Sequence, residues 1–107
     1  MYSDETRQLM GTAGALKKAA LLLGCTFLLL YGDMFHFFDF WPVVKQHHQN
    51  QALATVILKR TGDPQMPDIA EIEPETSRML RWHCRPHSIN ELISRTFCNR
   101  GLYVLSK

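Results

Sequence analysis

Asp33 is the carboxylate whose position in this sequence most strongly suggests chemistry. It follows Gly32 at the end of the apolar run 26–31, which is typical of a strand buried on both faces. In open α/β sheets, ligands bind at the carboxyl ends of the strands. A carboxylate there can hold Mg²⁺ through one oxygen while phosphates and water complete the octahedron. Because Gly-Asp is also common in turns, an ordinary turn is the alternative interpretation.

Two other segments contain candidate binding residues. Gly11 and Thr12 begin a run of small residues, 11–16, where open backbone N–H groups at a helix start can meet an anion or a base edge. An ordinary helix entry explains the same pattern. Arg85 can hold a phosphate through two parallel N–H groups. A zinc site is an alternative use of this part of the chain, although the spacing fits no familiar zinc pattern. Its ligands would be His83, Cys84, His87 and Cys98.

The apolar periodicity predicts the elements that position these residues. A helix is expected over 12–23, ended by Gly24, and a second over about 40–49, with Asp39 as N-cap and Pro42 in its first turn. Continuous apolar or alternating runs predict the strands. These are 26–31, 52–59, 68–73, 78–83 and 97–105.

The order helix, strand, helix, strand in the first half predicts an α/β fold with a crossover connection. We therefore expect a partial Rossmann-like fold, a mainly parallel sheet to which the second half adds a β-rich segment. One domain would cover residues 1–107. So few central strands would leave sheet edges open, which predicts that the chain is part of a larger domain and can self-associate through those edges.

Composition excludes several classes of protein. The hydrophobic fraction of 46% is typical of a folded domain, and the net charge of +2 comes from dispersed cations, which argues against a nucleic-acid partner. The longest apolar run, 19–31, is shorter than the roughly 20 residues of a membrane span. Three cysteines and the absence of a secretory signal favour a reducing, cytoplasmic location.

Taken in order, four segments resemble the sugar-1-phosphate nucleotidyltransferases, or sugar-nucleotide pyrophosphorylases. They are Leu9–Leu16, Thr26–Asp33, Gln51–Thr55 and Asn99–Val104. The last is similar to the family's Asn-Ala-Gly-Ile-Tyr-Val strand. Residues 68–72, 80–83 and 85–87 look most like the branch that activates mannose or heptose 1-phosphates with guanine nucleotides.

The resemblance implies roles for the matched residues. Asp33 would be one of two Mg²⁺ ligands, and Gly11, with Thr12 beside it, would present its backbone to the nucleobase. Ala70 would lie against the sugar, Asn99 would meet sugar hydroxyls and Arg85 would hold the sugar phosphate. The chain departs from the family at Cys84, Arg85 and Arg100, where Glu, Lys and Ala are usual.

The implied reaction transfers a nucleoside monophosphate from a triphosphate, here GTP, to a sugar 1-phosphate and releases pyrophosphate. Such transfer depends on positioning and on charge neutralisation by Mg²⁺. The family's Gly-rich phosphate loop is not found before Gly11, and a second metal-binding Asp is expected beyond residue 107. This fragment is therefore expected to be inactive alone. The alternative is a non-catalytic binding or interaction module that keeps part of a sugar-nucleotide fold.

Overall fold

The computed structural model describes residues 3, 10–35, 37–61, 68–84 and 97–107. Helices and strands in this part of the chain lie within a few residues of the positions that the periodicity predicts. In chain order they are α1 (Gly11–Ala19), the 3-10 helix η1 (Ala20–Leu22), β1 (Thr26–Leu30), α2 (Trp41–Gln49), β2 (Ala54–Arg60), β3 (Ile69–Ile72), β4 (Met79–His83) and β5 (Phe97–Ser106).

The five strands form one sheet around β5, and each of their pairings is antiparallel. β5 pairs with β2 along one edge and with β1 and β3 along the other, and β4 pairs with β3. The prediction of a mainly parallel, Rossmann-like sheet is therefore wrong. The fold is a mostly antiparallel sheet with two short α-helices.

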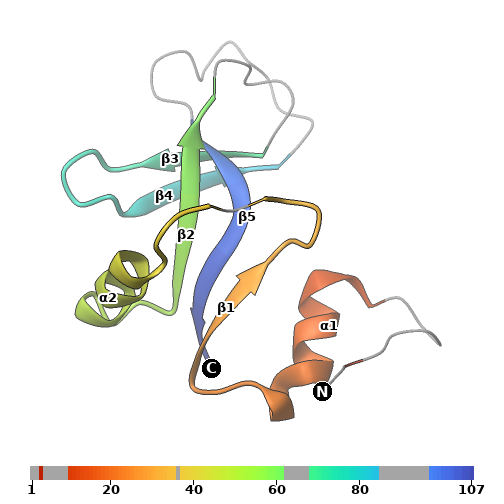
Figure 1. Cartoon of the computed structure of the whole chain (residues 1–107). Coiled ribbons are helices and arrows are strands. Elements are labelled where there is room, and N and C mark those ends of the chain that lie inside the picture. The colour runs from red at the N-terminus through yellow and green to blue at the C-terminus, as the bar shows by residue number, and fades with distance from the viewer. Residues whose placement is uncertain (1–2, 4–9, 36, 62–67, 85–96) are drawn as a thin grey trace.

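The sequence correctly indicates a crossover connection from β1 to β2, but it does not indicate that β5 lies between these two strands. Both β1 and β2 are antiparallel to β5, so they run in the same direction, as the connection through α2 predicts (Figure 1). The last strand of the chain, β5, lies between them and hydrogen-bonds to both. Such pairings join residues far apart in sequence, and local periodicity contains no information about them.

The buried core is small and lies mainly on β5. Leu102 and Val104 of β5 and Ile69 and Ala70 of β3 are fully buried, and Cys98 packs beside Ile69. The expected burial of β1 on both faces is wrong, because Leu28 is 40% exposed. An antiparallel sheet can leave one face to solvent, which explains the difference.

The two helices differ in how closely they join the sheet. α2 packs against β2 and β5, whereas the close contacts of α1 in the described part of the chain are with η1, which continues it. In Figure 1, α1 lies on the side of β1 remote from β5. None of the helices among the described residues has the length and apolar character needed to cross a membrane.

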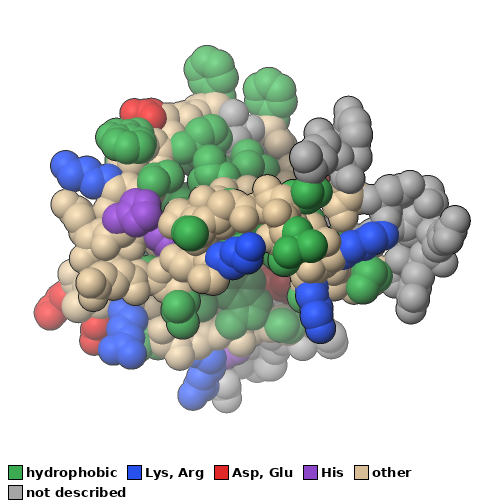
Figure 2. Space-filling model, turned by 90° about the horizontal axis from the view of Figure 1, so that it is seen from below, with side chains coloured by type: hydrophobic (Ala, Val, Ile, Leu, Met, Phe, Trp, Pro, Cys, Tyr) green, Lys and Arg blue, Asp and Glu red, His purple; other side chains and the backbone are tan. Residues whose placement is uncertain are grey.

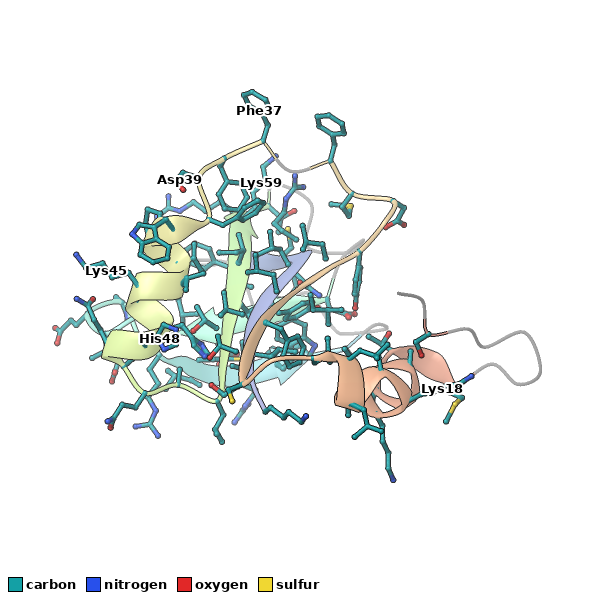
Figure 3. The ribbon with its side chains drawn as sticks, turned by 60° about the horizontal axis from the view of Figure 1, so that its bottom comes forward. Lys18, Phe37, Asp39, Lys45, His48 and Lys59 are labelled. Carbon is teal, nitrogen blue, oxygen red and sulfur yellow. The ribbon has the colours of Figure 1, made fainter. Side chains whose placement is uncertain are left out.

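Charged side chains are dispersed over the surface. Figure 2 shows Lys and Arg side chains separated from one another by apolar and uncharged ones on the face seen there. Several large apolar side chains are nevertheless fully open to solvent, among them Phe37, which points away from the ribbon in Figure 3. The Lys and Arg side chains on this face therefore do not form a continuous stripe.

Candidate functional site

A short break in strand pairing along β5 brings together the residues with the best binding chemistry. β1 ends at Leu30, opposite Leu102, and β3 begins at Ile69, opposite Cys98. Since β2 takes the other edge of β5, residues 99–101 lie between the end of β1 and the start of β3. We call this place the sheet gap. It comprises residues 99–101 of β5, with Tyr31 directly after β1 and Asp68 directly before β3.

Two backbone hydrogen bonds close the ends of the sheet gap. The Tyr31 N–H donates to the Gly101 carbonyl at 2.8 Å, and the Asn99 N–H donates to the Asp68 carbonyl at 3.3 Å. The register between β2 and β5 shifts at the same level, where residues 99–103 of β5 oppose only residues 56–58 of β2. The extra residues form a bulge, a feature that redirects side chains.

The side chain of Asn99 holds this bulge together. Its Oδ1 accepts the Gly101 N–H at 2.9 Å, and its Nδ2 donates to the Tyr103 hydroxyl. A side-chain amide has two N–H donors and two acceptor lone pairs, so within the described part of the chain one donor and one acceptor position of Asn99 have no partner. That remaining pair is suited to a hydroxyl group, which both donates and accepts.

Two tyrosines extend the cluster toward solvent. The Tyr103 hydroxyl donates to the Tyr31 hydroxyl at 3.4 Å, and the two rings lie 5.9 Å apart between centroids. Burial raises the pKa of Tyr103 to about 12, and its hydrogen bond to Tyr31 and the nearby Asp68 carboxylate act in the same direction. Tyr103 is therefore a neutral donor near pH 7, and the exposed Tyr31 hydroxyl keeps its own hydrogen for a ligand.

Gly101 is required at the centre of the bulge. Its φ is +65°, and a Cβ on it would lie 2.8 Å from the Tyr31 ring. A side chain at this position would therefore be strained and would collide with Tyr31.

Asp33 lies two residues beyond Tyr31, in an exposed turn that the Met34 N–H closes by donating to the Tyr31 carbonyl at 3.2 Å. The structure therefore brings two separately predicted residues, Asp33 and Asn99, to the same end of β1. An exposed single carboxylate fits Mg²⁺ that keeps waters and substrate phosphates as its other ligands.

Three other predicted site residues, Ala70, Gly11 and Thr12, are not part of the sheet gap. Ala70 is fully buried on β3, opposite Phe97. Gly11 and Thr12 are exposed at the start of α1, and Gly11 has a φ of +68° with open space around it. Arg85 lies outside the described residues.

The zinc alternative gains no geometric support in the described ranges. Within them there is no group of three or more His, Cys, Asp or Glu side chains that could hold a metal ion. The His83 imidazole pairs with the Glu71 carboxylate at 2.7 Å, and Cys98 is buried beside Ile69. Cys84 is an exposed free thiol, and His87 is outside the described residues.

The tyrosine hydroxyls and Asp68 are the site residues that the sequence interpretation missed. Asn99, Gly101 and Tyr103 alternate along one strand, so their spacing alone indicates one face of a sheet. The contribution of Tyr31 has no such local signal, because its partner Tyr103 is 72 residues away.

Comparison with known proteins adds no identification. The chain matches no model of a protein family, and no curated protein matches its sequence.

Proposed function

We propose that the sheet gap binds a sugar 1-phosphate as the acceptor in nucleotidyl transfer. The observation that carries this proposal is the meeting of two segments. The Tyr31–Asp33 turn and the Asn99–Tyr103 bulge, separately similar to the nucleotidyltransferase motifs, are joined by the 2.8 Å bond from the Tyr31 N–H to the Gly101 carbonyl. The proposal depends on this local geometry and not on a parallel sheet.

The chemistry of these side chains suits the parts of such a ligand. The open donor and acceptor of Asn99 and the Tyr31 hydroxyl match the hydroxyl groups of a sugar. Asp33 would hold Mg²⁺, which neutralises phosphate charge. An oxygen of the sugar phosphate would attack the α-phosphorus of GTP, and the bond to pyrophosphate would break as the new one forms.

We also propose a cytoplasmic location, where a nucleoside triphosphate and a sugar phosphate are available as substrates. The described cysteines Cys25, Cys84 and Cys98 are free thiols, which agrees with a reducing compartment.

A second candidate is a non-catalytic module that binds sugar nucleotides. It is favoured by the internal hydrogen bonding of the cluster, because Asn99 and Tyr103 already hold each other and the bulge. Such a cluster can present a fixed binding surface without a catalytic group.

Pyrophosphate release separates the two candidates. The chain, alone and extended by any upstream coding sequence, is incubated with GTP or another nucleoside triphosphate, Mg²⁺ and a panel of sugar 1-phosphates. Released pyrophosphate is measured beside ligand binding. Release by the extended chain that requires both substrates and is lost in Asp33→Asn supports transfer, whereas binding without release by either chain supports the module. If the chain shows no binding and no release, both candidates are contradicted. Release that survives Asp33→Ala would show that Asp33 is not the metal ligand.

A further inference from the structure

β2 has one open edge among the described residues. It pairs with β5 on its other side only. The Ser106 N–H donates to the Leu53 carbonyl at 3.0 Å, which makes this a hydrogen-bonded pair of the ladder. Hydrogen-bonded pairs alternate along an antiparallel ladder, so the N–H and C=O groups of Ala54 and Val56 point away from β5. These groups form a row that another strand can join.

A groove of about 650 Å³ runs along this edge. Val43 and Gln46 of α2, Ile72 and Met79 of the β3–β4 hairpin, and Phe97 of β5 are among the residues that line it. Figure 1 shows α2 and the hairpin turn extending to the same side of β2. Side chains of a strand alternate between two faces, and those on one face of a strand placed here could contact the apolar side chains of Val43, Ile72 and Met79.

We propose that this groove receives β2 of a second copy of the chain, in antiparallel pairing centred on Ile57. β2 itself has the required character, since its residues from Thr55 to Leu58 are mostly apolar and β-branched and its charges, Lys59 and Arg60, are confined to one end. Antiparallel pairing places Lys59 opposite Thr55 of the partner subunit, so like charges stay apart. A parallel arrangement would bring the four cations together, which is unfavourable.

The other open edges in the described part of the chain fit a second copy less well. β4 has Arg81 at its centre, and a charge on an edge strand discourages pairing. The outer side of β1 faces α1 in Figure 1, and β1 is shorter than β2. The proposed dimer is independent of the proposed binding at the sheet gap, because none of Tyr31, Asp33 and Asn99 lines the groove.

Light scattering after size-exclusion chromatography gives the first test. The full chain is expected to show twice the 12.4 kDa mass of one copy at micromolar concentration. Val56→Pro removes an edge-facing N–H, and we expect it to raise the dimer dissociation constant by about tenfold. A mass of one copy at every concentration would overturn the proposal.

Cross-linking tests the register and does not depend on the proline variant folding. In a Cys25→Ser, Cys84→Ser background, Ile57→Cys is expected to form a disulfide-linked dimer on mild oxidation. Cα atoms in a central non-hydrogen-bonded pair lie about 4.5 Å apart, within reach of a disulfide. Leu28→Cys on β1 is the matched control and is expected to stay unlinked. Linkage through Leu28→Cys and not Ile57→Cys would assign the contact to another edge and overturn the inference.

Discussion

At the scale of single residues, the sheet gap depends on the backbone of Gly101 and on three polar side chains. Gly101 lets β5 bulge toward Tyr31, and Asn99 fixes the bulge by accepting the Gly101 N–H. The Tyr103 hydroxyl connects Asn99 to Tyr31. A change in any of these residues should therefore alter both the stability of the strand and the shape of the proposed binding surface.

Gly101→Ala is expected to destabilise the protein by about 1–3 kcal/mol, because the added Cβ requires a strained positive φ and displaces the Tyr31 ring. Urea unfolding followed by tryptophan fluorescence measures the loss. Gly32→Ala is the matched control, since Gly32 has open space and no positive φ, and its stability should stay within about 0.5 kcal/mol of the parent. Equal stability of the two variants would contradict the role of Gly101.

Tyr103 should make stability depend on alkaline pH. Its pKa is raised from 10.0 to about 12 in the fold, so the neutral phenol is favoured there. This contribution is complete below pH 10 and is lost as the pH rises through 12. Comparing urea unfolding of the parent and Tyr103→Phe between pH 8 and 11 isolates it. The stability difference between the two proteins should change above pH 10, and a difference that stays constant would show that Tyr103 titrates normally.

The sequence predicted part of this cluster, for a physical reason. Asp33 closely follows the apolar run of β1, which is a local signal, and Asn99 lies within a segment that resembles a strand of the nucleotidyltransferases. The hydroxyls of Tyr31 and Tyr103 belong to residues that also suit an apolar strand, and their contact follows only from the pairing of β1 with β5. Arg85 stays a prediction.

At the scale of elements, His47 joins α2 to the sheet. It is 1% exposed, and both ring nitrogens are hydrogen-bonded at 2.9 Å, Nδ1 with the Thr55 hydroxyl and Nε2 with the Ser106 hydroxyl. Because Ser106 donates its own hydrogen to the Ala52 carbonyl, it accepts from Nε2, and Thr55 donates to Nδ1. One neutral tautomer therefore satisfies the whole network.

This network predicts a loss of stability in mild acid. Burial, with the neighbouring His48 as a second cause, lowers the pKa of His47 below 6.5, so the fold favours the neutral ring. The contribution is present above pH 6.5 and is lost as the pH falls through the lower folded value. His47→Gln should cost about 1–3 kcal/mol at pH 8 and flatten the decline in unfolding free energy between pH 7 and 5. His48→Gln, at an exposed residue, removes only the second cause and should keep most of the decline. An unchanged decline in His47→Gln would contradict this account.

Element positions were predictable from the sequence, and their pairing was not. The apolar run 26–30 and the Asp39–Pro42 helix start are local signals, and the Asp39 carboxylate accepts the Trp41 N–H at 2.9 Å although the helix is capped one residue later, at Phe40. The choice of β5 as the partner of both β1 and β2 depends on contacts across the whole chain. The alternation of helices and strands therefore predicted a parallel sheet, and this prediction is wrong.

At the scale of the whole molecule, a small core supports a sheet with open edges. The fully buried residues lie mainly on β5 and β3, while large side chains such as Leu21 and Phe37 are 94% exposed. Dimerisation through β2 would cover one open edge. The sheet gap lies on the opposite edge of β5, so the binding proposed there is compatible with either oligomeric state.

Calorimetric titration of mannose 1-phosphate into the chain, with and without Mg²⁺, tests most directly whether the sheet gap binds a metal–phosphate group. We predict saturable binding that requires Mg²⁺, weakens by about tenfold in Asp33→Asn and is unchanged in Asp39→Asn. Asp39 is an exposed carboxylate in the same connection, and it accepts the Trp41 N–H at the start of α2. An absence of binding, or binding of equal strength in Asp33→Asn and without Mg²⁺, would contradict the assignment of this site.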